Sequence, residues 1–474
     1  MLGRTRTIHF VGVGGIGMSG IAELLANLGY DVSGSDVKRS DVTARLETLG
    51  VRVFSGHAAG HVGAADVVVT SSAIAADNPE VVEARRRGIP VIPRAEMLAE
   101  LMRLRYGIAI AGAHGKTTTT SMVALVLERA GLDPTAVIGG RLSAFGSNAR
   151  LGRGDYMVVE ADESDRSFLK LSPSIAVVTN IDREHMESYG SWDNLQEAFA
   201  DFANKVPFYG AIVACADDAP VRGMLPRLTR RVITYALDDR GGVEADIVGT
   251  GIRLEAFGSS CTVQHRLPDG PRTELGTVRI QVPGRHNMLN ALAAVAVGIE
   301  VGVPFARLAE ALAEFSGAER RFQKLGEANG VLVVDDYGHH PTEIAAVIAA
   351  ARAGINRRVV VVFQPHRYSR TSQLLGAFGT ALGAADEIVL TDIYAAGEAP
   401  IPGITIEALA AAVRAAATCP VHLVKALADV PAAVASLSRP GDLVITMGAG
   451  SIGGVGDRIL AAIAAGRVAT GGRP

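Results

Sequence analysis

Cysteine is scarce in this chain of 474 residues, which has only Cys215, Cys261 and Cys419. The three lie far apart and form no paired motif. This spacing argues against a disulfide framework and against a zinc site built from clustered thiolates. It is typical of a protein that works in a reducing cytosol.

A strong excess of one charge is also missing, as are long hydrophobic runs. The formal net charge is −3 and the isoelectric point is near 6.4, so no basic field predicts a nucleic-acid or membrane partner. No uncharged apolar stretch reaches the length of about 18 residues that a membrane span needs. The first apolar run breaks into glycines after Val13, which predicts a β-strand rather than a signal peptide.

What the chain does have is a regular alternation of short apolar runs and longer amphipathic segments. This alternation predicts an α/β fold with parallel sheets, and the length predicts several domains. We predict three, at residues 1–106, 107–317 and 318–474, with a small antiparallel sheet inserted at 240–283 in the second. The predicted strands that lead into motifs are 8–13, 31–35, 67–70, 106–111, 156–160, 175–179, 331–335 and 359–363.

A phosphate-binding loop is predicted by the sequence AGAHGKTTTT at 111–120, between a strand and a helix. Gly112 and Gly115 let backbone N–H groups approach phosphate oxygens. Lys116 can reach the outer phosphates, and the Thr117 hydroxyl can hold Mg²⁺. We therefore expect a nucleoside triphosphate here.

A second glycine-rich turn follows the first strand. Gly12, Gly14 and Gly17 form G-x-G-x-x-G, and Asp36 follows the second strand. This pattern indicates a diphosphate-linked nucleoside, of which NAD(P) is one case and a nucleotide sugar is another. Glycines used only for tight packing are the alternative.

Acidic residues and a histidine follow two strands of the second block. Glu160 opens the run EADESD, and His185 closes the run NIDREH. Four carboxylates at a strand end favour a cation, and Mg²⁺ takes carboxylates together with phosphates. A solvated acidic turn and a structural histidine are the alternatives.

Two strand ends of the third block, which we expect to be adjacent, carry the runs DDYGHHP (335–341) and FQPHRYSRT (363–371). Arginine pairs suit the bidentate capture of carboxylate or phosphate. Arg320 and Arg321 are either phosphate contacts or surface charges. Asn287 and Asn290, where a helix begins, either read an adenine edge or cap the helix.

Taken together, these motifs resemble the Mur ligase family, the ATP-dependent amide-forming enzymes of peptidoglycan precursor synthesis. Ten blocks carry the resemblance in order: HFVGVGGIGMSGIAE, SGSD, TSSAI, GAHGKTTTT, EADESDRSF, GRHNMLNA, GAERRF, DDYGHHPTE, FQPHRYSRT and DIYAAGEAP. The phosphate loop has Ile110 where the usual pattern has a glycine, and this shortening is a trait of the family.

The resemblance implies a Rossmann-like domain that binds a UDP-sugar without NAD, a central P-loop ATPase, and a Rossmann-like domain for the amino acid. It implies UDP-N-acetylmuramate and L-alanine as substrates, with ATP and two Mg²⁺ ions. We expect a cytoplasmic bacterial protein that is a monomer or a weak homodimer. One alternative is a related ligase that adds another amino acid or a peptide to the same UDP-sugar. Others are an NAD(P) oxidoreductase and a nucleotide-gated binding protein.

The resemblance also implies site residues. The catalytic residues are Lys116, His185, His339, Arg367 and Arg370. The ATP contacts are Gly112, Ala113, His114, Gly115, Lys116, Thr117, Thr118, Asn290, Arg321 and Asp335. The UDP-sugar contacts are Gly14, Gly15, Ile16, Gly17, Ser35, Asp36, Ser71 and Ser72. The amino-acid contacts are Tyr337, His366, Arg367 and Arg370. The metal ligands are Thr117, Glu160 and His185.

Two departures from the family pattern stand out. Glu319 occupies a position where relatives often carry glycine, which bears on the turn before Arg320. Several relatives also use a carbamylated lysine at the second metal, and no clear counterpart is found here.

Overall fold

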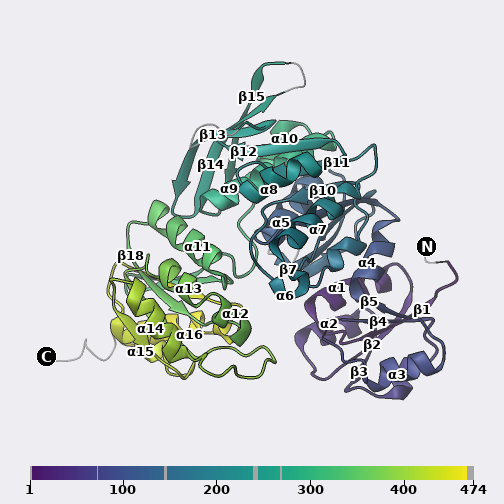
Figure 1. The fold of residues 1–474 in the computed structure, drawn as a ribbon, viewed down its shortest axis with the longest axis horizontal. Helices are drawn as coiled ribbons and strands as arrows, with labels where there is room; N and C mark the ends of the chain where they lie inside the picture. The colour runs from purple at the N-terminus through teal and green to yellow at the C-terminus, as the bar shows by residue number, and fades with distance from the viewer. Residues whose placement is uncertain (1–2, 72, 143–146, 239–243, 267–269, 467–474) are drawn as a thin grey trace. The chain divides into compact units, whose positions relative to one another are not determined.

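The computed structural model describes residues 3–71, 73–142, 147–238, 244–266 and 270–466 (Figure 1). Three sheets form, one in each predicted block. By packing, the chain divides into two compact units. The first comprises residues 1–252, 261–279 and 288–315, and the second comprises 253–260, 280–287 and 316–474.

The first sheet is parallel throughout, with the strand order β3-β2-β1-β4-β5. Its strands are β1 (Thr7–Val11), β2 (Asp31–Asp36), β3 (Arg52–Ser55), β4 (Val67–Thr70) and β5 (Val91–Pro93). Its helices are α1 (Ile16–Asn27), α2 (Asp41–Thr48), η1 (Ala59–Val62), α3 (Pro79–Arg86) and α4 (Arg94–Met102). The order reverses at β1, so the glycine-rich turn after β1 lies at the switch point where such sheets bind ligands.

The second sheet has ten strands in the order β15-β14-β13-β12-β11-β10-β6-β9-β7-β8. Its strands are β6 (Tyr106–Ala111), β7 (Thr135–Leu142), β8 (Ser147–Arg150), β9 (Tyr156–Glu160), β10 (Ile175–Val178), β11 (Ala211–Cys215), β12 (Val232–Leu237), β13 (Ile247–Glu255), β14 (Gly258–Arg266) and β15 (Arg272–Ile280). Its helical segments are α5 (Lys116–Arg129), η2 (Ser167–Lys170), α6 (Met186–Tyr189), α7 (Trp192–Asn204), α8 (Ala219–Met224), η3 (Leu225–Arg227), α9 (Arg285–Glu300) and α10 (Phe305–Ala313). Since β6 lies between β9 and β10, the phosphate loop is flanked by both polar runs.

The predicted insertion does not form a separate sheet. β13 pairs in parallel with β12, and Tyr235 faces Ile247 across the pair. β14 and β15 then continue the same sheet outward. The insertion is therefore one edge of the second sheet, which is mixed.

One hydrophobic core joins the first two sheets. Phe10 of β1 and Met97 of α4 belong to the same buried cluster as Phe168 of η2 and Phe199 of α7. This shared core explains why the first two predicted blocks pack as one unit.

The third sheet has the order β16-β17-β21-β18-β19-β20 and is parallel except for the β16–β17 pair. Its strands are β16 (Gln323–Ala328), β17 (Val331–Asp336), β18 (Arg358–Phe363), β19 (Glu387–Leu390), β20 (Val421–Leu423) and β21 (Asp442–Met447). Its helical segments are α11 (Pro341–Gly354), α12 (Tyr368–Gln373), α13 (Leu375–Leu382), α14 (Ile406–Ala416), α15 (Val430–Leu437), η4 (Ser451–Gly454) and α16 (Gly456–Gly466).

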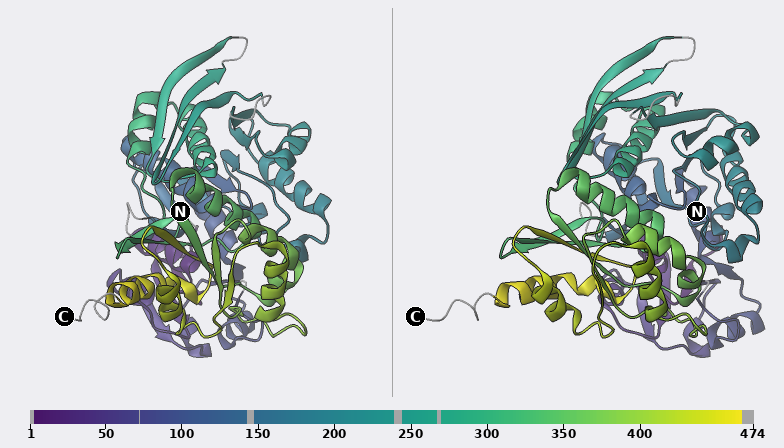
Figure 2. Two further views of the ribbon diagram at one scale, coloured as in Figure 1. Left: turned by 90° about the vertical axis from the view of Figure 1, so that its left-hand side faces the viewer. Right: turned by 60° about the vertical axis from the view of Figure 1, so that its left-hand side comes forward.

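Both faces of this third sheet are covered by helices (Figure 2). Along β17, β18, β19 and β21, side chains alternate between two buried clusters, so Val334 belongs to one cluster and Val333 to the other. The expectation that the two motif-bearing strands are neighbours was wrong. β21, the last strand in sequence, lies between β17 and β18.

Among the described residues, none of the helices combines the length and the hydrophobicity that crossing a lipid bilayer requires.

Candidate active site

The phosphate loop has the backbone that its glycines predict. Gly112 has φ 145° and Gly115 has φ 81°, a region that side chains disfavour. A Cβ on Gly112 would collide with the Thr179 hydroxyl, and one on Gly115 would lie 2.6 Å from Asn290 Oδ1. Both glycines are therefore needed for backbone conformation and for space. The same contact brings Asn290, a predicted ATP contact on α9, against the loop.

The residues that follow β10 hold the loop in place through hydrogen bonds. The N–H groups of Ala113 and His114 donate to the backbone oxygen and to Oδ1 of Asn180, at 3.1 and 2.8 Å. The Asn180 amide and the Thr179 hydroxyl donate back to the His114 carbonyl at 2.9 and 2.8 Å. Two N–H groups that we expected at the phosphates are thus used to shape the loop. We predicted no role for Asn180, although it lies in the quoted run NIDREH.

The start of α5 remains suited to an anion. The helix begins at Lys116, and Gly115 supplies no side-chain cap. Its first N–H groups have no partner within the helix, and a helix start of this kind is the usual site for an anion. Thr117 and Thr118 lie in this first turn.

The Lys116 ammonium lies folded into its own loop. It donates to the carbonyls of Gly112 and Ala113 at 2.6 and 3.0 Å, and to Glu163 Oε1 at 2.8 Å. Burial by itself would lower the pKa of Lys116, but the charges of Glu163 and Glu160 raise it above its ordinary value. The lysine therefore stays charged.

A group of three metal-binding side chains lies beside this lysine. Ligand atoms of Glu163, Glu184 and His185 all lie within 4.8 Å of one another. Two carboxylates suit Mg²⁺, and the imidazole adds a ligand that Mn²⁺ also accepts. The donor set therefore fits a divalent cation. It contains His185 from the predicted ligands but adds Glu163 and Glu184, which the sequence did not single out. Glu160 lies at the end of β9.

His185 owes its position to its backbone. It adopts a left-handed conformation with φ 54° at the N-cap of α6. Its Nε2 lies 3.4 Å from Glu184 Oε2. In the same segment, Asp182 Oδ2 lies 3.0 Å from Nε2 of His114 in the loop.

The glycine-rich turn after β1 is closed by Asp36. The Gly14 N–H donates to Asp36 Oδ2 at 2.9 Å, and a Cβ on Gly14 would lie 2.8 Å from the same oxygen. A Cβ on Gly17 would collide with the guanidinium of Arg94, which donates to Asp162 Oδ2 at 3.3 Å. Arg94 therefore joins the predicted UDP-sugar turn to the acidic run of the second block. No sequence motif pointed to this arginine.

The other predicted UDP-sugar contacts lie in different parts of the first domain. Gly15 is the N-cap of α1, and Ile16 begins that helix. Ser71 Oγ would lie 3.9 Å from a Cβ on Gly12. Ser72 lies outside the described residues.

Ser35 faces a buried carboxylate instead of the turn. Its hydroxyl donates to Glu80 Oε2 at 2.5 Å, and both side chains are fully buried. His9 and His61 approach the same carboxylate at 3.4 and 2.9 Å, and His57 Nδ1 lies 2.9 Å from the Ser35 hydroxyl. Burial alone would raise the pKa of Glu80, but hydrogen bonds from His9 and Ser35 lower it to about 2.

In the second unit, Asp335 lies in a buried ion pair. Arg320 Nε donates to it at 2.8 Å and the Thr446 hydroxyl at 2.5 Å. The guanidinium groups of Arg320 and Arg321 both lie 5.2 Å from the centre of the Tyr337 ring. These contacts give both arginines a structural setting, so they are not simple linker charges.

Histidines gather above the end of β21. The ring centres of His339 and His366 lie 5.7 Å apart, and His366 stacks on Tyr394 at 5.5 Å. Burial lowers the pKa of His366 to about 4, with His339, Arg370 and Arg367 adding to the effect. The Arg367 N–H donates to the Tyr394 carbonyl at 2.8 Å. The motifs at β17 and β18 therefore meet even though β21 separates their strands.

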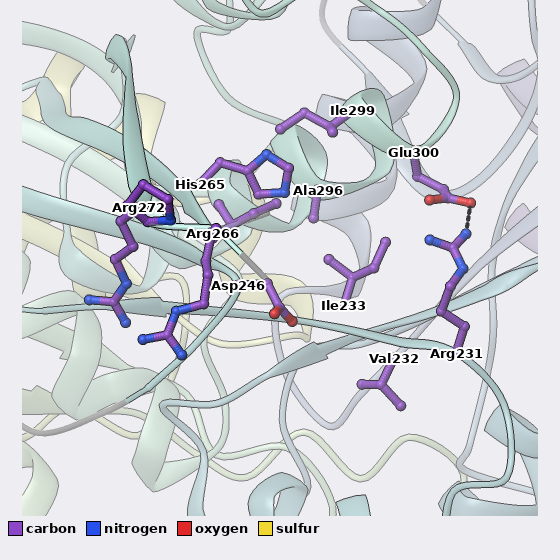
Figure 3. Close-up of a pocket in the computed structure, with 13 residues that line it drawn as sticks. Arg231, Val232, Ile233, Asp246, His265, Arg266, Arg272, Ala296, Ile299 and Glu300 are labelled. Atoms are coloured by element: carbon purple, nitrogen blue, oxygen red, sulfur yellow. Dashed lines mark hydrogen bonds and ion pairs between the residues drawn. The ribbon is translucent and has the colours of Figure 1, made fainter. Parts of the chain in front are cut away.

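A separate cavity of about 700 Å³ lies at the opposite end of the second sheet, where β12 and β13 begin (Figure 3). Four of its charged residues have polar partners. Arg231 pairs with Glu300, Asp246 accepts from the Thr234 hydroxyl at 2.7 Å, and Arg266 lies 3.4 Å from Glu244. This cavity is remote from the phosphate loop, which follows the other end of β6.

Three family models match successive parts of the chain. They are described as the Mur ligase family catalytic domain at residues 7–106, the Mur ligase middle domain at 110–298, and the Mur ligase glutamate ligase domain at 320–450. The chain belongs to the Mur ligase family. The loop of Gly112 to Thr117 falls within the middle domain.

Relatives of similar length support this membership of the Mur ligases. The UDP-N-acetylmuramate–L-alanine ligase of Anaeromyxobacter sp. strain Fw109-5 is 56% identical over 460 residues, which covers 96% of this chain and 98% of that protein. The enzyme of the same name from Geobacter sp. strain M21 is 55% identical over 97% of this chain and 98% of its own length.

Solved structures of Mur ligases have the same fold. The UDP-N-acetylmuramate-alanine ligase of Thermotoga maritima superposes with a TM-score of 0.78 and 29% identity, over 98% of this chain and 100% of that one. The murein peptide ligase of Psychrobacter arcticus superposes with a TM-score of 0.69 over 97% of this chain and 99% of its own. At 24% identity, the second likeness concerns the fold alone.

Proposed function

We propose that this Mur ligase joins L-alanine to the lactyl carboxylate of UDP-N-acetylmuramate, using ATP, in peptidoglycan precursor synthesis. The observation that carries the proposal is the phosphate loop between β6 and α5, beside the carboxylate and histidine group. Relatives that carry this activity in their names and cover nearly the whole chain support the choice of substrates.

The reaction proposed has two steps. A lactyl carboxylate oxygen attacks the γ-phosphorus of ATP, the bond to the bridging oxygen breaks, and an acyl phosphate and ADP result. The amine of alanine then attacks the acyl carbon, loses a proton, and expels phosphate. Two anions must meet in the first step, so positive charge has to be supplied at the phosphates.

The chain supplies part of this charge itself. Lys116 is held charged at the loop, and the start of α5 adds its N–H groups and dipole. Bound Mg²⁺ would supply further charge neutralisation at the phosphates. In this proposal its ligands come from Thr117, Glu160 and His185, together with Glu163 and Glu184, and two ions bind.

The other substrates are assigned to the flanking domains. The UDP-sugar is proposed to bind at the turn of Gly14 to Gly17, closed by Asp36. The amino acid is proposed to bind near Tyr337, His366, Arg367 and Arg370, whose arginines suit its carboxylate. His185 and His339 are the candidates for accepting the proton of the amine, and Arg321 and Asp335 for meeting the nucleotide.

The proposal also includes domain boundaries at 106/107 and 317/318, a cytoplasmic location, and a monomer or weak homodimer as the oligomeric state.

The deciding experiment measures phosphate release with ATP, Mg²⁺ and UDP-N-acetylmuramate against a panel of amino acids and the tripeptide that a peptide ligase would use. We expect release to depend on L-alanine. Stimulation by the tripeptide but not by alanine would replace the proposal with the related peptide ligase. Oxidation of NAD(P)H without phosphate release would remove it altogether.

A further inference from the structure

All the hydrogen-bond donors of Lys116 are in use. An ammonium group has three N–H donors, and the acceptors at hand are the carbonyls of Gly112 and Ala113 and the carboxylate of Glu163. The Lys116 side chain is only 15% exposed. A phosphate bound in the loop can therefore gain this lysine only if one of the three contacts breaks.

Of the three contacts of Lys116, the one with Glu163 would cost the most free energy to break. Glu163 is 3% exposed, and a buried carboxylate that loses its counter-charge is strongly destabilising. Yet Glu163 also belongs to the group with Glu184 and His185, whose ligand atoms lie within 4.8 Å of one another. A divalent cation in that group would restore positive charge beside Glu163.

We propose that Glu163 exchanges one positive partner for another when nucleotide binds. Without nucleotide it holds Lys116 back in the loop. When Lys116 moves to the phosphates, a divalent cation takes its place beside Glu163. This inference rests on the proposed function, because it requires a nucleotide and a divalent cation at this loop.

The exchange has a consequence that simple metal–phosphate binding does not share. Glu163 makes nucleotide binding weak when no divalent cation is present, because Lys116 must leave a buried carboxylate uncompensated. Glu163 also makes Mg²⁺ raise the nucleotide affinity by more than it would if Mg²⁺ bound to the phosphates alone. Both effects depend on Lys116.

The test is the dissociation constant of ADP for the full chain, measured by calorimetry in EDTA and in Mg²⁺. For Glu163→Gln we expect ADP to bind about tenfold tighter in EDTA, the equivalent of one charge-assisted hydrogen bond. We expect a correspondingly smaller gain on adding Mg²⁺. Glu163→Asp, which keeps the charge but draws it back from Lys116, should shift both values in the same direction and serves if the glutamine variant does not fold.

Glu184→Gln is the matched control. It removes the same charge from the same group, and Glu184 lies within ion-pair distance of His114 and His185. It should weaken the response to Mg²⁺ without the tenfold gain in EDTA. In a Lys116→Ala background, Glu163→Gln should bring no more gain than Glu184→Gln does.

Three results would overturn the exchange. These are an unchanged or weaker ADP affinity of Glu163→Gln in EDTA, a gain equal to that of Glu184→Gln, and a gain that persists without Lys116. The proposed function fails separately, through phosphate release that does not depend on alanine. A wild-type chain that bound no ADP in either buffer would overturn both.

Discussion

Asn290 Oδ1 lies so close to Gly115 that a methyl group on Gly115 would come within 2.6 Å of it. The two residues belong to distant parts of the chain, the phosphate loop and α9. Their contact means that the loop has room for backbone only at position 115. Any side chain at position 115 would have to displace Asn290.

Gly115→Ala should therefore weaken nucleotide binding by at least about tenfold, because the left-handed backbone costs about 1–2 kcal/mol and the collision adds to it. Gly131→Ala is a matched control, since Gly131 has the same φ of 81° but nothing within 4 Å of the added methyl. The measurement is nucleotide affinity together with thermal unfolding. Equal losses of affinity in the two variants would show that the Asn290 contact is irrelevant.

Lys116→Ala should lower phosphate release by about a hundredfold or more, since it removes a charge aimed at the reacting phosphates. Binding of the UDP-sugar should stay within about twofold of wild type, because that site is assigned to another sheet. Lys170→Ala is the control, as Lys170 makes a half-exposed ion pair with Glu96 and should leave both measurements unchanged. Release that survived in Lys116→Ala would contradict the assigned role.

Glu80→Gln should destabilise the chain at neutral pH by about 1–3 kcal/mol, because the amide replaces a buried acceptor of several hydrogen bonds. The lowered pKa of Glu80, about 2, also sets a pH dependence. A carboxyl with a depressed pKa stabilises the fold above its unfolded pKa, so this contribution is lost as pH falls from about 4.5 towards 2.

Urea unfolding at several pH values would measure the difference in free energy of unfolding between wild type and Glu80→Gln. Glu83→Gln, on the same helix, is the control. Glu83 makes a surface pair with Arg86, so its loss should lower stability much less than Glu80→Gln does. The free energies of unfolding of wild type and Glu80→Gln should approach each other in acid. If they did not, the result would argue against the buried hydrogen-bond network around Glu80.

His366 should stay neutral at pH 7, since its pKa is lowered to about 4. In the unfolded chain His366 takes up a proton below about pH 6.5, whereas the buried side chain stays neutral. The free energy of unfolding therefore decreases as pH falls from 6.5 towards 4. His366→Asn should make stability less sensitive to pH in that window. Nuclear magnetic resonance of the imidazole would check the titration, and a midpoint near 6.5 would contradict the burial argument.

Much of the site could be predicted because its chemistry is local. Gly112, Gly115 and Lys116 lie in one turn, and a strand followed by glycines and a helix places them together whatever surrounds them. The runs after β9 and β10 were also recognisable, because parallel strands deliver their ends to the same edge of a sheet.

Side-chain direction was harder to predict. Ser35 stands at the end of β2 as expected, but it turns to Glu80, because three histidines and a buried carboxylate provide hydrogen bonds that no local pattern reveals. Arg94 and Asn180 were missed for the same reason. Their roles arise from partners far away in sequence.

The sequence by itself determined the family, through ten motifs in order. It also determined the strands along the chain and the residues of the phosphate loop, because hydrophobic patterning and turn geometry are local. Only the tertiary structure decided that β21 lies between β17 and β18, that β13 extends the parallel sheet, and that Glu163 holds Lys116. Those outcomes depend on which distant segments bury each other's apolar faces and satisfy each other's charges, and that balance exists only in the folded chain.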